Sequence, residues 1–305
     1  MAKYWIGDFI KEMRERRGYT QEDLSFGICS ASSLSRIETG TQNPSNQTLD
    51  ALMERLGIES GMFTEYVSRE EAEYYTIKGE VRQAILKQEY GKLESLVQKL
   101  EKVTDNKVDF EKQYYLYAKG VLLFSKGKKD NMVLDCYMKA IRVTLPQFDG
   151  ENPLERNLLT FDEITIINAI ASVYASQGKL NEAINLGKWL KNYMERNVLD
   201  VDERRKKYPM LVFNLTNWLN ARKRYLDVID VADAGIKFCT EVGSLHYFPF
   251  IIFNKAYALA ELGKLKEAKR FFIQAAAIFD SMDKAEQKEK TIAWCYERYR
   301  MIINV

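Results

Sequence analysis

The sequence predicts an all-α protein in which a small helical head precedes a right-handed helical solenoid. Three observations support this fold class. Apolar residues between positions 5 and 57 recur at helical spacing, a glycine-lysine turn motif returns along the rest of the chain, and the turns are separated by distances typical of paired-helix repeats. The hydrophobic content of 46% is sufficient for a sizeable core in a chain of 305 residues.

The overall charge does not attract the protein to nucleic acid or to a membrane. The 45 basic and 43 acidic residues leave a formal net charge of +2, so any DNA binding must be local. No apolar run approaches the roughly 20 residues that span a bilayer, and the first residues lack the apolar stretch of a signal peptide. We therefore expect a cytoplasmic protein that makes no contact with a membrane.

The cysteines do not form a metal-binding pattern. Cys29, Cys136, Cys239 and Cys295 are isolated, and His246 is the single histidine, so we expect no metal and no cofactor. In a reducing compartment such thiols are usually buried as small apolar groups. The sequence also lacks a nucleophile–histidine constellation and a glycine-rich phosphate loop, which argues against an enzyme.

Two short helices are predicted at the start of the head. Residues 5–17 carry inward-facing apolar positions at helical spacing, and Gly18 ends this helix. Thr20 then caps a second helix that begins at Gln21 with acidic residues in its first turn, which suit the positive end of a helix dipole. Leu24 supplies the inward face of this second helix.

Two further helices complete the head. Ser30 caps the third helix, in which Leu34 and Ile37 point inward, and Gly40 ends it. A fourth helix is predicted from about residue 46 to residue 56. Four short helices with a tight turn between the second and the third match the helix-turn-helix arrangement, in which the third helix lies in the major groove.

Specific residues of the head resemble a known type of DNA-binding domain. The residues that carry the resemblance are Ile6-Gly7, Ile10-Lys11, Arg14, Gly18-Tyr19-Thr20-Gln21-Glu22-Asp23-Leu24, Ser33-Leu34-Ser35-Arg36-Ile37-Glu38-Thr39-Gly40, Pro44-Ser45 and Leu49. Together they are similar to the phage-repressor, or XRE, type of helix-turn-helix over about 55 residues. The usual turn glycine is interpreted as replaced by a shorter connection at residues 28–30, a variant that resembles PlcR-like peptide-responsive regulators.

The resemblance implies a set of DNA-contacting residues. Gln21 would bind a phosphate, while Ser32, Ser33 and Arg36 on the exposed face of the third helix would meet the groove, together with Ser30 at its start. Arginine can bridge guanine acceptors, and a serine hydroxyl can serve either a base or a phosphate. An alternative for Ser32 and Ser33 is that they only keep the helix surface soluble.

Not every charged residue of the head is expected to touch DNA. The resemblance implies that Arg14 pairs with Glu38 inside the fold. Residues 1–62 contain seven Lys and Arg against nine Asp and Glu, hence 7 − 9 = −2, an unusual balance for a DNA-binding domain. We expect affinity to depend on helix termini, on a second copy in a dimer, and on the local cations Lys11, Arg16 and Arg17.

The remainder of the chain contains a repeated turn. Its copies are Gly91-Lys92-Leu93, Gly178-Lys179-Leu180 and Gly263-Lys264-Leu265, with weaker copies at Gly127-Lys128-Lys129 and Lys223-Arg224-Tyr225. Positions 91, 127, 178, 223 and 263 give separations of 36, 51, 45 and 40 residues, slightly longer than the roughly 34 of a tetratricopeptide repeat. The predicted division is therefore a head at 1–66 and five stacked tetratricopeptide-like hairpins at 67–305.

Loops and a capping helix complete the repeat prediction. Pro146, Gly150 and Pro153 indicate one connecting loop, and the segment 200–209 indicates another. Residues 285–303 are predicted to form a capping helix with one apolar face, which carries Ile292, Tyr296, Tyr299 and Ile303.

Asparagines recur at matching positions before the turns. Asn214 and Asn254 each stand nine residues before the turn of their unit, and Asn217 stands six before it. The pattern resembles repeats of peptide-sensing proteins, in which such amides grip the backbone of an extended peptide by donating and accepting together. Tyr257 would form a pocket wall, and Asn168 is a weaker, out-of-phase candidate. Alternatively, these asparagines bridge neighbouring helices or face water.

The combined layout resembles the RRNPP family of Gram-positive regulators. The resemblance implies a quorum-sensing transcriptional regulator that binds a double-stranded DNA operator as a homodimer and is controlled allosterically by a short linear oligopeptide pheromone. An alternative remains open, namely a DNA-binding scaffold whose repeats hold a partner protein and no free peptide.

Overall fold

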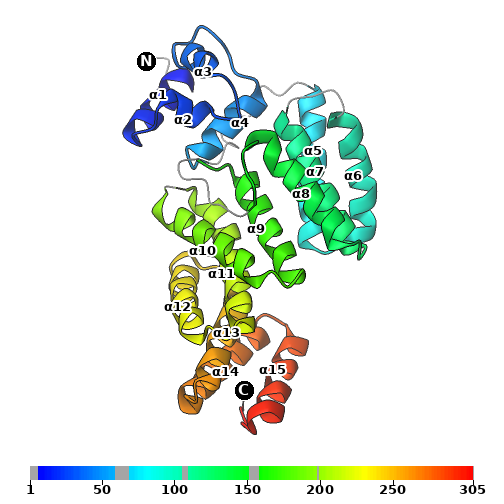
Figure 1. Cartoon of the computed structure of the whole chain (residues 1–305), viewed down its shortest axis with the longest axis vertical. Coiled ribbons are helices and arrows are strands. Elements are labelled where there is room, and N and C mark those ends of the chain that lie inside the picture. Colours follow the sequence, from blue (N-terminus) through cyan, green and yellow to red (C-terminus); the bar gives the residue numbers. More distant parts are fainter. Residues whose placement is uncertain (1–5, 59–68, 105–108, 151–157, 198, 305) are drawn as a thin grey trace. The chain divides into compact units, whose positions relative to one another are not determined.

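The computed structural model describes residues 6–58, 69–104, 109–150, 158–197 and 199–304, and these residues form helices and connecting turns without a β-strand. The all-α prediction is confirmed. The chain divides into two compact units (Figure 1). The N-terminal unit comprises Met1–Gln177 with Asn197–Asp200, and the C-terminal unit comprises Gly178–Arg196 with Val201–Val305.

The head consists of four short helices: α1 (Ile6–Arg16), α2 (Gln21–Ser25), α3 (Ala31–Glu38) and α4 (Asn46–Arg55). These agree with the predicted helices to within about two residues at each end. Their inward side chains, among them Ile10, Leu24, Leu34 and Leu52, are fully buried in one apolar cluster. Burying each such side chain stabilises the fold by roughly 1.5–3 kcal/mol relative to exposing it.

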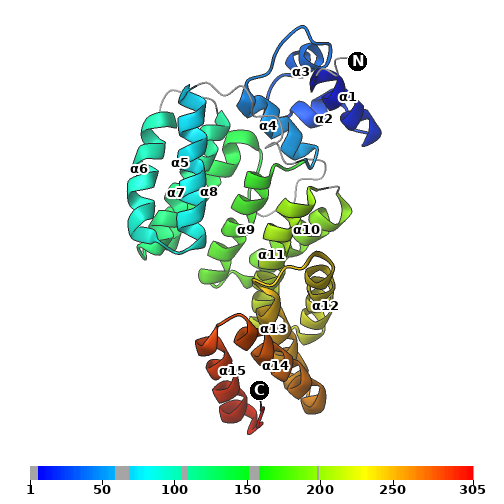
Figure 2. The same ribbon diagram turned by 180° about the vertical axis from the view of Figure 1, so that it is seen from behind.

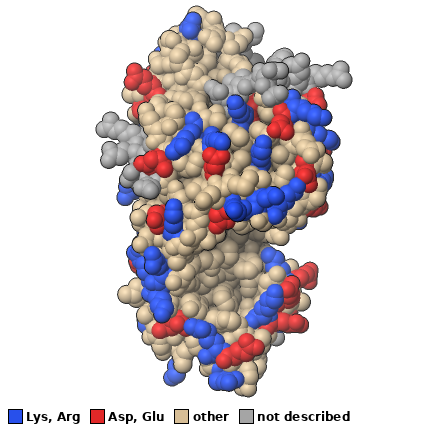
Figure 3. All heavy atoms as spheres, turned by 45° about the vertical axis from the view of Figure 1, so that its right-hand side comes forward, with Lys and Arg blue, Asp and Glu red and all other residues tan. Residues whose placement is uncertain are grey.

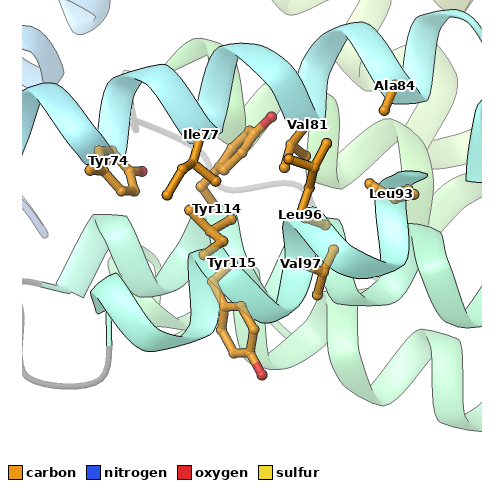
Figure 4. Close-up of a cluster of buried hydrophobic side chains, with 11 residues drawn as sticks. Tyr74, Ile77, Val81, Ala84, Leu93, Leu96, Val97, Tyr114 and Tyr115 are labelled. Carbon is orange, nitrogen blue, oxygen red and sulfur yellow. The ribbon is translucent and has the colours of Figure 1, made fainter. Parts of the chain in front are cut away.

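The rest of the N-terminal unit is built from longer helices. They are α5 (Arg69–Leu86), α6 (Tyr90–Thr104), α7 (Asp109–Ser125), α8 (Asp130–Thr144) and α9 (Phe161–Ser176). Successive helices pack side by side from α5 to α8, as both ribbon views show (Figures 1 and 2). The core between α5, α6 and α7 combines aliphatic side chains such as Val81 and Leu96 with Tyr74, Tyr114 and Tyr115 (Figure 4).

The C-terminal unit continues the paired-helix pattern. Its helices are α10 (Leu180–Arg196), α11 (Val201–Ala221), α12 (Tyr225–Val242), α13 (Phe248–Glu261), α14 (Leu265–Ser281) and α15 (Ala285–Tyr299). Each packs on the next, and α11 also packs on α13. The tetratricopeptide-like architecture predicted from the repeated turns is therefore confirmed.

The turns inside the hairpins share a left-handed residue, and several of them share one hydrogen-bonding pattern. Gly127, Gly178, Lys223 and Gly263 all have positive φ, as the turn prediction requires. After Gly127, Lys223 and Gly263, the next backbone N–H donates to a carbonyl five residues earlier, which is the Schellman arrangement that satisfies helix-end carbonyls. Glycine adopts this conformation without strain, whereas Lys223 does so at a cost.

The turn predicted at Gly91 lies three residues earlier in the structure, at Gln88. Gln88 has φ 58°, and the following amide of Glu89 donates to Ala84, so the turn ends α5 at this point. Gly91 lies inside the first turn of α6. The repeated motif therefore marks the start of the second helix of each hairpin, and the left-handed residue does not always coincide with its glycine.

The loop predicted at 200–209 is also wrong, because α11 begins at Val201 and contains Pro209. A proline inside a helix cannot donate to the carbonyl four residues earlier. Here that carbonyl belongs to Arg205, and it accepts a hydrogen bond from the Ser244 hydroxyl at 3.3 Å instead. The Arg205 guanidinium in turn donates to the Gly243 carbonyl at 3.0 Å. The connection between α12 and α13 thus compensates for the proline.

Two other expectations are partly met. A loop follows α8 from Leu145 to Gly150 as predicted, while Pro153 lies outside the described residues. The capping helix α15 exists but ends at Tyr299, and Tyr296 is 52% exposed, so its placement on the inner face was wrong. Thr291 and Cys295, one turn apart, form the buried face, and the extended tail adds Met301 and Ile303 to the same core.

The head does not separate from the first repeats as a compact unit of its own. The predicted boundary at residue 66 lies outside the described residues, and α1–α4 cluster with α5–α9 in the N-terminal unit. Within the described residues, no helix is long and apolar enough to cross a membrane.

The turn geometry leads to a stability prediction. Replacing Lys223 by Gly should raise the free energy of unfolding by about 1 kcal/mol, because it relieves a left-handed non-glycine residue. Gly263→Ala should lower the free energy of unfolding by a similar amount. The new Cβ would meet no neighbouring atom, but the alanine would have to adopt φ +79°, which is strained for a residue with a side chain. Urea unfolding followed by circular dichroism measures both changes. A change of the same sign in both variants would contradict the account of the turns.

Candidate functional site

The helix-turn-helix segment is capped at both of its helices. The Thr20 side chain accepts from the Asp23 amide, and Asp23 accepts from the Thr20 amide at 2.9 Å, so α2 begins with a capping box. The Ser30 hydroxyl accepts from the Ser33 amide at 3.0 Å and begins α3. Each cap satisfies helix-end donors that would otherwise lack a partner. The two predicted N-caps are confirmed.

The turn between α2 and α3 contains a glycine, contrary to the sequence interpretation. Gly27 has φ +68° and follows Phe26, the C-cap residue of α2. The connection at 28–30 therefore does not replace a turn glycine. A Cβ at Gly27 would overlap the Thr144 carbonyl at the end of α8, so glycine is required both by the backbone conformation and by the close approach of a repeat helix.

The outer face of α3 carries the predicted groove-facing residues. Ser30, Ser32 and Arg36 are exposed, and Ser33 is half-buried. The Ser30 hydroxyl lies 2.9 Å from those of Ser32 and Ser33, and Arg36 Nε donates to the Ser32 carbonyl at 3.3 Å. The structure therefore brings these four side chains together on one surface.

A buried ion pair holds α1 against α3. Arg14 Nε donates to Glu38 Oε1 at 2.6 Å and its Nη2 donates to Oε2 at 3.0 Å, while Nη1 donates to the Tyr19 carbonyl at 2.8 Å. The hydrogen bonds to Glu38 raise the pKa of the Arg14 guanidinium. The predicted internal pairing of these residues is confirmed.

Gln21 is engaged with the same pair. Its Nε2 donates to Glu38 Oε2 at 2.7 Å, and the side chain is half-buried. Its predicted phosphate contact would therefore require either the backbone N–H at the start of α2 or release of this hydrogen bond. Of the local cations, Lys11 and Arg16 are exposed and Arg17 is half-buried.

A second buried ion pair, which sequence reasoning missed, joins the head to the repeats. Arg55 Nη2 lies 3.2 Å from Glu163 Oε1, and both side chains are fully buried. Arg55 Nη1 also donates to the Phe26 carbonyl. The Thr160-x-x-Glu163 capping box was a readable signal for the start of α9, but no sequence pattern indicated the arginine 108 residues earlier as its partner.

Further contacts surround this ion pair. Gln47 Nε2 donates to Glu111 Oε1 at 2.8 Å, Glu54 Oε2 accepts from the Phe161 amide at 3.1 Å, and Leu158 packs in the head core. Beside them lies a cavity of about 240 Å³, and it is lined from both the head and the repeats. Within the N-terminal unit, the head and the repeats thus share one interface.

Four of the five predicted peptide-contacting residues lie on the facing helices α11 and α13. The Asn254 amide nitrogen donates to Thr216 Oγ1 at 2.8 Å and to Asn217 Oδ1 at 2.9 Å. Asn220 Nδ2 donates to the Asn254 carbonyl at 3.3 Å. Asn254 is 6% exposed, so its amide bridges two helices, which is one of the alternatives that the sequence left open.

The other candidates have different surroundings. Asn214 and Asn217 are half-buried on α11, whereas Asn168 is buried on α9, in the N-terminal unit. Tyr257 lies in an aromatic group, with its ring centroid 5.5 Å from that of Trp294, and the Arg298 guanidinium lies 5.6 Å from the Tyr257 ring. This tyrosine is therefore partly covered by α15.

The cysteines are mostly core residues, as expected. Cys136, Cys239 and Cys295 are buried, and Cys29 is half-buried. Burial raises the pKa of Cys239 to about 11 and that of Cys295 to about 12, which keeps both thiols protonated and unreactive. Among the described residues, no group of histidine, cysteine and carboxylate side chains could hold a metal ion.

Comparison with protein families agrees with this geometry. Residues 10–63 match the helix-turn-helix family, and residues 251–279 match the tetratricopeptide repeat family. The chain therefore contains one segment similar to helix-turn-helix domains and one similar to a tetratricopeptide repeat. No curated protein sequence is similar enough to match it.

Solved structures share the fold over almost the whole chain. PlcR from Bacillus thuringiensis, in complex with the peptide PapR7 and DNA, superposes with a TM-score of 0.61 at 21% identity, covering 94% of this chain and 99% of PlcR. Its apo form gives 0.60 at 19% identity, covering 94% and 98%. Nearly identical TPR-like repeats from Podosopora anserina give 0.50 at 12% identity, covering 72% of this chain and 100% of that chain. The resemblance to the RRNPP layout is thus confirmed at the level of the fold.

The internal ion pair of the head leads to a stability prediction. Arg14→Ala should lower the free energy of unfolding by about 3–5 kcal/mol, because it leaves the buried Glu38 carboxylate without its cation. The matched control is Arg16→Ala, whose ion pair with Glu12 is largely exposed and should change stability by roughly 0.5 kcal/mol or less. Urea unfolding distinguishes the two variants, and similar losses for both would refute the structural role of Arg14.

Proposed function

We propose that the protein is a cytoplasmic transcriptional regulator that binds operator DNA through α3 as a homodimer and responds to a short linear peptide held by its repeats. The observation that carries the proposal is the outer face of α3. There Ser32 and Arg36 are exposed on a helix that Ser30 caps and that a buried ion pair holds against α1. Support also comes from PlcR, which shares the fold and whose structure contains both a peptide and DNA.

The distribution of charge favours a DNA contact that depends on few residues. Basic and acidic side chains alternate over the face shown in Figure 3, without a large area of one sign. A protein of net charge +2 gains little long-range attraction to phosphate. Recognition would then depend on direct contacts from α3 and on two heads that bind together in a dimer.

The DNA contact is tested by changing Arg36. Arg36→Ala should weaken binding to a duplex selected by the full-length protein from a random-sequence library by roughly tenfold or more, the cost of losing one bidentate base contact. Ser33→Ala should weaken it less. Fluorescence anisotropy measures both, with Arg222→Ala, an exposed arginine of the C-terminal unit, as the control. Binding that is indifferent to Arg36 and Ser33 would remove α3 from the proposal.

The peptide would lie against α11 and α13. Asn214 and Asn217 are half-buried, so their amides can exchange partners with a peptide backbone, while Asn254 holds Asn217 in position. Tyr257 would border a side-chain pocket. Asn168 on α9 remains a separate candidate.

The peptide contact is tested by changing Asn217. Asn217→Ala should weaken binding of the active synthetic peptide by roughly tenfold, since the remaining peptide groups would be buried without partners. The peptide is taken from fragments encoded by a short secreted reading frame beside the gene, and calorimetry measures its binding. Asn181→Ala, exposed on α10, is the control. A wild-type protein that binds no such fragment would argue for a scaffold that holds a partner protein.

A further inference from the structure

We infer that Glu163, a residue of the repeats, is a positioning residue for the DNA-reading helix α3 and acts through Arg55 on the turn before that helix. The inference rests on the proposed function, because it concerns how firmly the head presents α3 to DNA. It identifies a site 127 residues beyond Arg36 in the sequence (163 − 36) that sets the strength of operator binding.

One guanidinium group connects the turn to the repeats. Arg55 donates through Nη1 to the carbonyl of Phe26 and through Nη2 to Glu163. Phe26 is the C-cap residue of α2 and stands four positions before Ser30, the N-cap residue of α3. Because a guanidinium is planar and its donors diverge at fixed angles, the position of the carboxylate determines where the Phe26 carbonyl is held.

Glu163 itself is held rigidly. Its Oε2 accepts from the Thr160 amide at 2.6 Å, and its Oε1 accepts from the Thr144 hydroxyl at 2.6 Å. Gln113 Nε2 then donates to Thr144 Oγ1 at 2.7 Å and to the Ala140 carbonyl at 3.1 Å. A buried series of hydrogen bonds therefore runs from α7 through α8 and α9 to the head.

The backbone of the turn also rests directly on a repeat helix. Gly27 approaches the Thr144 carbonyl so closely that it leaves no room for a Cβ. Thr144 is the residue whose hydroxyl donates to Glu163. The turn is thus seated by its backbone on α8 and held by Arg55 at its preceding residue.

The Arg55–Glu163 ion pair is better explained by its effect on the position of the turn before α3 than by a gain in the stability of the fold. Two charges buried together lose their hydration, and apolar side chains of similar size would often stabilise a protein as well or better. Arg55 Nε is buried without a hydrogen-bond partner among the described residues, so the geometry is not optimal for binding energy. The internal shape of the head is already maintained by Arg14, Glu38 and its own apolar core.

The test compares Glu163→Gln with a neighbouring control. The operator probe is the duplex selected from a random-sequence library, and binding is measured by anisotropy with the full-length protein. Glu163→Gln keeps the size of the side chain but removes the charge that holds Arg55, and it should weaken binding by roughly tenfold or more.

Asp162→Asn is the matched control. Asp162 is the adjacent residue on α9 and pairs with Lys78 at 2.8 Å in the same junction, but both side chains are about one quarter exposed. Removing the Asp162 charge should change the affinity for the operator by about twofold or less. If both variants weaken binding equally, the loss reflects general loosening of the junction and the inference is wrong.

A second readout does not require DNA. In Glu163→Gln the backbone amides of residues 27–31 should exchange with deuterium at least severalfold faster, whereas those of residues 10–14 in α1 should exchange at the wild-type rate. If the wild-type protein selects no operator, the proposed function fails, and the exchange data still decide the positioning role. Unchanged exchange at 27–31 would overturn it.

A further variant covers the case in which Glu163→Gln does not fold. Thr144→Val removes the hydroxyl that donates to Glu163 without changing any charge. It should have the same two effects as Glu163→Gln, but smaller ones. Operator binding should weaken by roughly threefold, and faster amide exchange should be confined to the turn. Wild-type behaviour in both measurements would overturn the inference.

Discussion

The buried guanidinium of Arg55 is the interaction on which the arrangement of the N-terminal unit depends. This one group donates hydrogen bonds both to the turn before α3 and to the N-terminal capping box of α9. Removing either partner of such a pair leaves a buried charge uncompensated, at a cost of about 3–5 kcal/mol. The contact therefore favours a head that stays seated on α8 and α9 over one that moves freely on a linker.

Under the proposed function, this arrangement gives the repeats a direct contact with the DNA-binding head. In a tethered design, the repeats would set only the spacing of two independent heads. Here the repeats supply Glu163 and Thr144, which hold the turn of the head, so a series of buried hydrogen bonds connects α7, α8 and α9 to the turn before α3. A ligand of the repeats can alter DNA affinity only through its differential affinity for two such states.

Local patterns in the sequence were sufficient for the helices, the caps and the repeated hairpins, because apolar spacing and capping residues act over a few positions. Gln88 and Pro209 show the limit of that reasoning. The first takes a left-handed turn without glycine, and the second is tolerated inside α11 because Ser244 bonds the carbonyl that it leaves free. The Arg14–Glu38 pair was recoverable from the family resemblance, whereas Arg55 and Glu163 meet only through tertiary packing. For the same reason, the sequence alone did not decide whether Asn254 faces a ligand or bridges α11 and α13.

Native-state hydrogen exchange at increasing urea concentration tests the claim that the head and α5–α9 unfold as one cooperative body. The amides of Leu34 and Leu52 in the head and of Ile166 and Ile170 in α9 all belong to fully buried residues. If the claim holds, they become exposed in one opening event, with the same free energy and the same urea dependence. Opening of the head amides at a distinctly lower free energy, while those of α9 stay protected, would contradict it.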